Sequence, residues 1–358
     1  MRLILPISIL ILLLALGLPL LLVYSPAREG QYAGANIVRP PLDSMGVHSG
    51  DADSDTGEHN SPLQGALGPK QDEQLILQVL VEEEIQEMSM AEFLQGAVAA
   101  EMPARFHPEA LRAQAVAART YTLHRMLIAP ASRHPEAYVC GSYACCKAFH
   151  SPERLRERWG PGFDYYSAII AEAVTSTDGV ILLYEDQPIL AAFHAASYGF
   201  TEYSGAIWNS VPYLQSVRSY EGPAEMPRFT ETVRLSFDEF RNIARREIPG
   251  VVLEDGNVPY WITEQRHTDS GRLCSLKIGG VTVTGPQFRR HFGLRSTALW
   301  FAFDAEGVAI TTGGHGHGVG MSQFGANTMA HLGLGFEAIL LWYYTDVTTG
   351  CMGTLFAP

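Results

Sequence analysis

Residues 89–127, SMAEFLQGAVAAEMPARFHPEALRAQAVAARTYTLHRML, decide the fold of this chain. Ser89 and Glu92 form the S-x-x-E pattern of a capping box, which predicts a helix that begins there and ends near Pro103. Pro108 suits the first turn of a second helix, where a proline removes no hydrogen bond. The stretch therefore predicts two consecutive helices. The second helix runs to about Leu127, and its alanines let other elements pack closely against it.

Beyond this stretch the pattern changes from helices to strands. Short apolar segments flank polar turns, as in β-hairpins. The predicted hairpins pair residues 180–184 with 189–194, 261–265 with 273–278, and 300–303 with 308–311. Further predicted elements are a strand at 75–81 and helices at 236–247, 323–331 and 336–344. Helices grouped first and hairpins later indicate one mixed α+β domain over residues 75–358, rather than a doubly wound parallel sheet.

Length and composition set the broad class of the protein. The chain has 358 residues, of which 47% are hydrophobic, so it buries a sizeable core and is not disordered as a whole. It carries 25 Lys and Arg against 38 Asp and Glu, a net charge of −13. A chain this acidic is repelled by phosphate backbones, so we expect no nucleic-acid partner. Five cysteines are too few for a disulfide-built scaffold.

The N-terminal region predicts a membrane location. Residues 3–24 form an uncharged apolar run of 22 residues, long enough as a helix to cross the hydrocarbon core. We therefore expect a transmembrane anchor over residues 1–24, with cleavage of a signal peptide near residues 33–35 as the alternative. Arg2 favours a cytoplasmic N-terminus and a body outside the cytoplasm. Residues 25–74 lack apolar periodicity and predict a flexible linker.

Glu101 is the candidate for acid–base chemistry. No other acidic residue lies between Glu92 and Glu109, and the neighbours of Glu101 are largely apolar. An apolar setting favours the protonated carboxyl group, which is what a general acid needs at neutral pH. The alternative is a partly exposed glutamate near a helix end with no chemical role. The residues alone leave both interpretations open.

Two arginines on the second predicted helix are candidates for substrate binding. Arg112 and Arg119 are seven residues apart, which is two helical turns, so they share a face. Paired guanidinium groups bind anionic groups through forked hydrogen bonds. The alternative is a solvated basic stripe without a ligand.

A cluster of His and Cys predicts a metal site. His134, Cys140, Cys145 and Cys146 fall within thirteen residues, and imidazole and thiolate are the usual ligands of zinc. Because adjacent cysteines rarely point at one metal, we expect His134, Cys140 and Cys146 to bind a structural Zn²⁺ ion, with the fourth position left for water or a neighbouring group. A disulfide between Cys140 and one of the adjacent pair is the alternative outside the cytoplasm.

Residues 313–326, GGHGHGVGMSQFGA, form a glycine-rich segment. So many glycines indicate a backbone that takes positive φ angles or approaches another group closely. The segment lacks the ending of a phosphate-binding loop. His315 and His317 share one face of an extended segment and are candidate metal ligands. Ser322 is suited to cap the next helix. A glycine-rich turn with solvated histidines is the alternative.

Two of these segments resemble the stage II sporulation protein D family. They are residues 96–121 (GAVAAEMPARFHPEALRAQAVAARTY) and residues 317–326 (HGVGMSQFGA), and the likeness covers most of the chain from about residue 75. The resemblance implies a lytic transglycosylase in the cell membrane at the sporulation septum, whose extracytoplasmic domain cuts peptidoglycan glycan strands during engulfment of the forespore. The implied partners are the stage II sporulation proteins P, an amidase, and M, a membrane scaffold.

The resemblance also implies roles for single residues. Glu101 falls on the family's catalytic glutamate, while Arg119, Ser322 and Gln323 fall on motif positions that line the substrate cleft. His317 opens the second motif and is likewise expected to bind substrate. In the implied mechanism, protonated Glu101 donates to the glycosidic oxygen beyond a muramic acid residue. It then accepts the proton of that sugar's O6 hydroxyl, which closes an anhydro ring without water.

This mechanism suggests what the two arginines of the second predicted helix bind. When an amidase removes a stem peptide, a free lactyl carboxylate remains, and Arg112 and Arg119 are expected to bind it. Two other classes of function stay open. One is a wall-binding module that activates an amidase without cutting glycan, and the other is a zinc hydrolase that uses the cluster of His and Cys.

Overall fold

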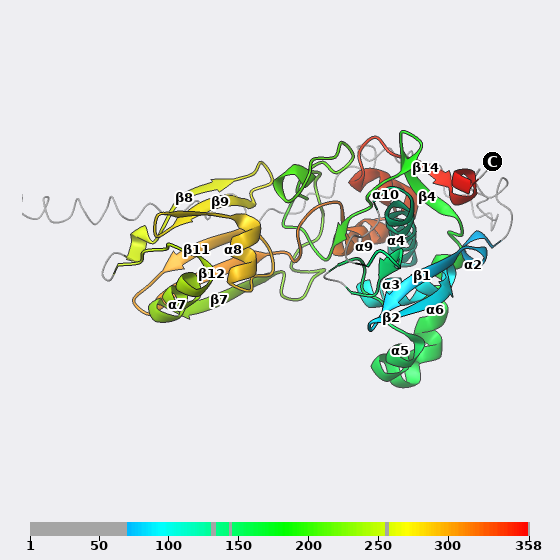
Figure 1. Cartoon of the computed structure of the whole chain (residues 1–358), viewed down its shortest axis with the longest axis horizontal. Coiled ribbons are helices and arrows are strands. Elements are labelled where there is room, and N and C mark those ends of the chain that lie inside the picture. The colour runs from blue at the N-terminus through cyan, green and yellow to red at the C-terminus, as the bar shows by residue number, and fades with distance from the viewer. Residues whose placement is uncertain (1–69, 130–133, 143–144, 255–257, 357–358) are drawn as a thin grey trace, which may run out of the picture. The chain divides into compact units, whose positions relative to one another are not determined.

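The computed structural model describes residues 70–129, 134–142, 145–254 and 258–356 (Figure 1). Within these residues, no helix is both long and apolar enough to span a bilayer. The predicted anchor over residues 1–24 and the predicted linker before Lys70 lie outside the described residues.

Helices dominate the first half of the described chain. Its elements are α2 (Gln71–Gln74), β1 (Ile76–Val81), β2 (Glu84–Ser89), α3 (Met90–Glu101), α4 (Pro108–Leu127), β3 (Val139–Cys140), α5 (Pro152–Trp159), η2 (Gly160–Gly162), α6 (Phe163–Thr175), β4 (Val180–Tyr184), β5 (Gln187–Pro188), β6 (Phe193–His194) and η3 (Ser204–Ala206). The predicted capping box is confirmed, because Ser89 Oγ accepts the N–H of Glu92 and the Glu92 carboxylate accepts the N–H of Ser89.

Strands dominate the next part, and helices return at the end. The elements are β7 (Thr230–Ser236), α7 (Phe237–Glu247), η4 (Val258–Tyr260), β8 (Ile262–His267), β9 (Leu273–Ile278), β10 (Val281–Thr284), α8 (Gly285–His291), β11 (Leu299–Phe303), β12 (Gly307–Gly313), β13 (Met321–Ser322), α9 (Gln323–His331), α10 (Phe336–Tyr343), β14 (Thr348–Cys351) and η5 (Met352–Phe356).

The sheets are small and mostly antiparallel. Their strand orders are β2-β1-β3, β10-β9-β8, β11-β12-β7, β13-β6 and β14-β4-β5. The parallel pairs are β1 with β3 and β6 with β13. Helices mixed with mainly antiparallel strands confirm the predicted α+β class.

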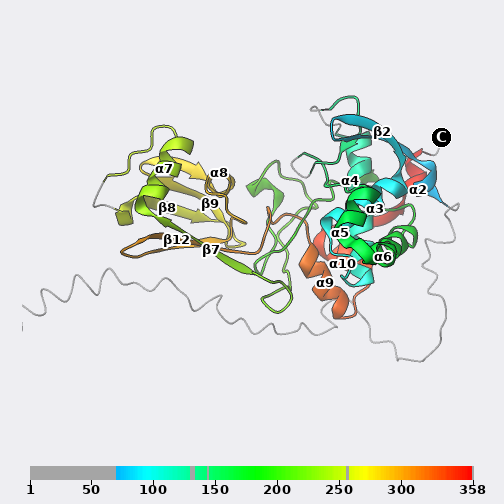
Figure 2. The ribbon, with the colours of Figure 1, turned by 90° about the horizontal axis from the view of Figure 1, so that it is seen from below.

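Helix α4 is the centre of the helical part. It packs against α3, α6, α9, α10 and β4, as Figures 1 and 2 show. Its buried side chains include Arg119, whose Nε and Nη2 donate to the two carboxylate oxygens of Asp72 at 2.7 and 2.5 Å. Asp72 lies in α2, so residues 71–74 form a docked helix where the sequence predicted the end of a linker.

The segment from β7 to β12 has an apolar core of its own. Helices α7 and α8 pack on its two three-stranded sheets (Figure 2). The aromatic side chains Phe240, Trp261, Phe288 and Phe292 are buried in this core. All residues of this core come from one continuous segment of the chain.

One predicted hairpin has a different register. The turn after β4 contains only Glu185 and Asp186, both with positive φ (49° and 60°), which is the geometry of a tight two-residue hairpin turn. The returning strand is therefore Gln187–Pro188 rather than the predicted 189–194, and the chain then leaves this sheet. The other two predicted hairpins are confirmed, as β8 with β9 and β11 with β12.

Candidate functional site

Glu101 is the last residue of α3 and is half-buried. Its Oε1 accepts the backbone N–H of Ala148 at 3.2 Å. The loop that carries Ala148 is held against α3, because His150 donates its backbone N–H to the carbonyl of Gly96 at 3.2 Å. The carboxyl group is thus partly shielded from water and oriented by a backbone donor.

Lys147 brings an amine to the same place. It is 6% exposed, and its Nζ lies 3.3 Å from the centroid of the Phe193 ring and 4.0 Å from that of Tyr121. Burial lowers the pKa of Lys147 to about 7, while the charge of nearby Glu101 acts in the opposite direction. A desolvated amine with two aromatic rings against it therefore lies within electrostatic reach of the Glu101 carboxyl group.

His317 joins this group from the glycine-rich segment. It is half-buried, its Nδ1 accepts the N–H of Val319 at 3.0 Å, and its ring meets that of Trp208 edge-on at 5.1 Å. Burial, and then the positive charges of Lys147 and two arginines, lower the pKa of His317 to about 3. His317 is therefore neutral at pH 7, with its hydrogen on Nε2, and the Phe193 backbone accepts a hydrogen bond from the ring. Of the predicted site residues, Glu101 and His317 thus both lie within electrostatic reach of Lys147.

The roles expected for Ser322 and Gln323 need correction. Ser322 is fully buried; its Oγ caps α9 by accepting the N–H of Gly325 and donates to the buried Glu221 carboxylate at 2.5 Å. Gln323 is 6% exposed and donates its Nε2 to Gln114 of α4 at 3.4 Å. Both side chains face the interior, so they hold α9 in place and do not line a binding surface.

The two predicted arginines lie on the other side of α4. Arg119 has no exposed surface, and besides Asp72 it donates to the Val180 carbonyl at 3.0 Å. Arg112 bonds to Glu109 at 2.5 Å and to Ser176 at 3.0 Å. The site residue Tyr121 follows Arg119 by two positions, about 200° around the helix. The expected binding of substrate by this pair is therefore corrected, because both side chains point towards α6 and away from Lys147.

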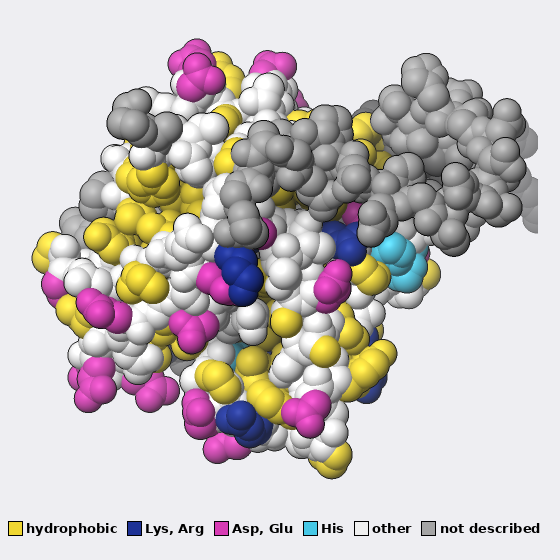
Figure 3. All heavy atoms as spheres, turned by 90° about the vertical axis from the view of Figure 1, so that its right-hand side faces the viewer, with side chains coloured by type: hydrophobic (Ala, Val, Ile, Leu, Met, Phe, Trp, Pro, Cys, Tyr) yellow, Lys and Arg dark blue, Asp and Glu magenta, His cyan; other side chains and the backbone are white. Residues whose placement is uncertain are grey.

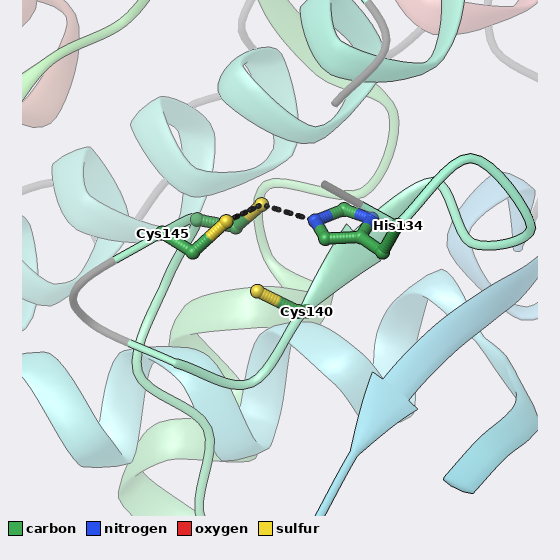
Figure 4. Close-up of side chains that lie close together, drawn as sticks. His134, Cys140 and Cys145 are labelled. Atoms are coloured by element: carbon green, nitrogen blue, oxygen red, sulfur yellow. Dashed lines mark hydrogen bonds between the residues drawn. The ribbon is translucent and has the colours of Figure 1, made fainter. Parts of the chain in front are cut away.

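The predicted His and Cys cluster does converge. Ligand atoms of His134, Cys140, Cys145 and Cys146 all lie within 4.8 Å of one another. Figure 4 shows the labelled side chains pointing towards a common centre. Cys146 Sγ lies 3.2 Å from His134 Nε2, and His134 Nδ1 lies 3.0 Å from the Ala137 carbonyl oxygen. That second contact places the hydrogen on Nδ1 and leaves the Nε2 lone pair facing the thiols, as a metal ligand requires.

The donor set fits a tetrahedral metal ion, with one imidazole and three sulfurs. The expectation that Cys145 points elsewhere is corrected, since its thiol belongs to the same group. No disulfide links any of the five cysteines, all of which lie in the described part of the chain. Burial raises the pKa of the Cys146 thiol to about 12, with the neighbouring thiols adding to the effect. A metal cation would offset this cost of the thiolate form.

Two elements place the metal group beside Glu101. Strand β3 pairs with β1 so that Cys140 lies opposite Leu80. The chain then runs from Cys146 directly into Lys147 and Ala148, the two residues that adjoin Glu101. An ion at the cysteines would therefore fix the loop that orients the carboxyl group.

Sequence reasoning missed Lys147 and Trp208. The available signal for Lys147 was its rarity, because the chain contains three lysines and 22 arginines and one lysine directly follows the cysteine pair. Trp208 carries no local signal, since its contact with His317 joins segments far apart in the chain.

The sequence also matches known proteins. The family model described as stage II sporulation protein matches residues 81–184. The chain is 35% identical to stage II sporulation protein D of Bacillus subtilis (strain 168), over 73% of this chain and 74% of that protein. It is 36% identical to stage II sporulation protein D of Bacillus amyloliquefaciens, over 74% of each. It is 26% identical to the amidase enhancer of Bacillus subtilis (strain 168), over 71% of this chain and 40% of that protein.

Proposed function

This chain belongs to the stage II sporulation protein D family, and from that premise we propose that it is a lytic transglycosylase of peptidoglycan. The observation that carries the proposal is the setting of Glu101. Its carboxyl group is half-buried, accepts the Ala148 N–H at 3.2 Å and interacts electrostatically with the buried amine of Lys147. One shielded, oriented carboxyl group suits a reaction in which the same residue acts first as acid and then as base.

In the proposed reaction, Glu101 gives its proton to the glycosidic oxygen beyond a muramic acid residue, and the bond from that oxygen to C1 breaks. The O6 hydroxyl of the same sugar then bonds to C1 and returns its proton to Glu101, so no water is consumed. The Ala148 N–H stabilises the carboxylate that exists between the two transfers. Trp208, which is 38% exposed, offers a flat apolar surface to a sugar ring, and the His317 ring packs against it edge-on.

The test compares the wild-type chain with Glu101→Gln on peptide-free glycan strands, with the strand ends identified by mass spectrometry. We expect anhydro ends from the wild type and a loss of about 10²–10⁴-fold in the variant, the range for removing a general acid. Reducing ends would show hydrolysis instead. An absence of cleavage by the wild type would contradict the proposal.

The similarity to an amidase enhancer favours a second candidate function. In that case the chain binds the wall and raises the activity of an amidase without cutting glycan. The Glu101→Gln variant separates the two functions. If the chain only activates an amidase, the variant should raise the activity of a purified amidase to the same extent as the wild type does. A variant that lost both activities would count against the second candidate.

We propose Zn²⁺ as the ion of the metal group, with a structural role, since imidazole and thiolate together select zinc. His134, Cys140, Cys145 and Cys146 would hold it, and it would supply rigidity to the loop that orients Glu101. Purified protein should contain about one zinc per chain by elemental analysis. Cys140→Ser should lose it, while the exposed Cys274→Ser serves as the matched control and should keep it.

The cellular setting is part of the same proposal. Residues 3–24 would anchor the chain in the membrane at the sporulation septum and the engulfing membrane, with the domain outside the cytoplasm. There it would act with the stage II sporulation proteins P and M. Fractionation of sporulating cells tests this, since a chain recovered only in the soluble fraction would contradict an uncleaved anchor.

A further inference from the structure

The hairpin of β1 and β2 has one strand edge without a partner, and the reaction above does not use it. The sheet order is β2-β1-β3, so β2 lies at the margin of its sheet (Figure 1), and no described strand pairs with its outer edge. In an antiparallel ladder, alternate residues direct their N–H and C=O away from the neighbouring strand. Residues 84–87 of β2 are all exposed. A row of open backbone donors and acceptors therefore faces outwards, with the spacing that an added strand requires.

A groove adjoins this edge. It has a volume of about 310 Å³ and lies between β2 on one side and helices α5 and α6 on the other. Its floor is α3, which packs against both β2 and α6 and contributes Gly96 and Ala99 to the lining. The far wall is apolar and is formed by Leu155, Trp159, Phe163 and Ile170.

The inner face of the hairpin continues into the groove. Met88 of β2 lies opposite Leu77, which has no exposed surface, and Met88 itself lines the groove. Gln86, two residues away, points to the same face and also lines the groove. Because side chains alternate along a strand, every second side chain of a strand added beside β2 would lie over the groove. The others would lie on the outer face next to Ile85, which is 46% exposed.

The hairpin is acidic and has no cation of its own. Glu82 and Glu83 form its turn, Glu84 and Glu87 follow in β2, and residues 71–104 contain no Lys or Arg. These four carboxylates are exposed and make no hydrogen bond or ion pair with the residues that the structure describes. Figure 3 shows a similar imbalance over one whole face, where acidic side chains are many and basic ones are few. Carboxylates without counter-ions repel one another and attract a cationic partner.

The two faces of the edge call for different side chains. The far wall of the groove belongs partly to α5, which carries three arginines, so the side chains of a partner that enter the groove have to be uncharged. On the outer face, the side chains of the same partner lie beside Glu87 and approach the acidic turn. An apolar residue at every second position with a basic residue between is therefore the pattern that fits.

We infer that β2 is a docking edge for an extended, basic segment of another protein, which adds a fourth strand to this sheet. Its apolar side chains enter the groove, and its Lys or Arg side chains meet the open carboxylates of the hairpin. A protein strand is the matching occupant because its backbone supplies a regular row of donors and acceptors, which a glycan lacks. Charges on an edge strand otherwise serve to keep other strands away, and the test separates that role from docking.

The test measures the binding of a short fluorescent peptide, in which Lys and Val alternate, to the full chain by fluorescence anisotropy. Two further peptides carry methyl groups on the backbone nitrogens of all Lys or of all Val residues. Only one of these alternate sets of N–H groups faces β2. Methylation of that set should weaken binding by about tenfold because hydrogen bonds to the edge are lost, and methylation of the other set should leave binding unchanged.

Variants of the chain test the charges. Glu83→Lys combined with Glu87→Lys should weaken binding of the unmodified peptide by about tenfold, because attraction becomes repulsion. The matched control is Glu185→Lys combined with Asp186→Lys, in the two-residue turn between β4 and β5. It changes the net charge by the same amount and should leave binding unchanged. All four side chains are exposed, so both variants stay folded, which circular dichroism verifies.

Three results would overturn the docking edge. The first is no binding of the alternating peptide, which would show that the glutamates only protect the edge. The second is equal weakening by both methylated peptides, and the third is equal weakening in both pairs of variants, which would show a response to net charge alone. The inference goes beyond the proposed function, because Glu101→Gln should bind the peptide as the wild type does. Loss of either one therefore leaves the other standing.

Discussion

Arg119 and Arg272 are both buried, and the molecule holds them in opposite ways. Each nitrogen of Arg119 has an acceptor, among them the Asp72 carboxylate and the carbonyl of Val180. The nitrogens of Arg272 have none among the described residues. The comparison teaches that burial of a cation does not reveal its role, whereas its partners do. The first arginine joins α2, α4 and β4, and the second keeps a charge without a direct partner against the backbone of Gly318.

Removing one partner of the first arginine should have the largest effect on stability. Asp72→Asn leaves Arg119 buried without a counter-ion, so we expect the free energy of unfolding to fall by about 3–5 kcal/mol. Urea unfolding followed by circular dichroism measures it. The double variant Asp72→Leu with Arg119→Met is the control and should recover most of the loss, since no charge then stays buried. A loss below about 1 kcal/mol in the single variant, the range of an exposed pair, would refute this interpretation.

A methyl group at Gly318 tests how closely the glycine-rich segment packs on Arg272. Gly318→Ala should cost about 1–3 kcal/mol, because φ is +89° there and the new Cβ would press on Arg272. Combined with Arg272→Met the loss should shrink, since the steric part is relieved while the backbone strain remains. Additive losses in this double-mutant cycle would show that the two residues do not touch.

Replacing the second arginine itself should hardly change stability. Arg272→Met removes a buried charge without a direct partner, so we expect the free energy of unfolding to stay within about 1 kcal/mol of the wild type or to rise. The same urea titration applies. A loss as large as that of Asp72→Asn would mean that Arg272 is a structural lock like Arg119, and the contrast between them would disappear.

The smallest effect is on the protonation of His317. Its pKa lies near 3 because of burial and neighbouring positive charges, so the unfolded chain binds this proton more readily than the native one below pH 6.5. The contribution of His317 to stability is thus present above pH 6.5 and is lost as the pH falls towards 3. NMR titration should show a higher pKa in Arg272→Met and no change in Arg119→Met, provided that variant stays folded. An unchanged pKa in Arg272→Met would remove this arginine from the site.

Much of the local structure was predictable from the sequence. The helix predicted at 323–331 has the same bounds in the structure, and the Ser89 capping box forms as expected. The convergence of His134, Cys140 and Cys146 was also predictable. In each case the feature depends on residues close together in the chain, such as a helix cap or closely spaced metal ligands. Such features can therefore be read directly from the sequence.

The roles of the charged residues were decided by the tertiary structure. Arg119 lies 47 residues from Asp72, and nothing in its own segment announces that partner. Lys147 meets the Phe193 ring, and Arg272 meets the Gly318 backbone, only because the fold brings distant segments together. The sequence by itself determined many of the elements, the family and Glu101 as the candidate acid. Only the packing decided which cations are neutralised and which keep no direct partner, because the energy of a buried charge depends on the groups placed around it.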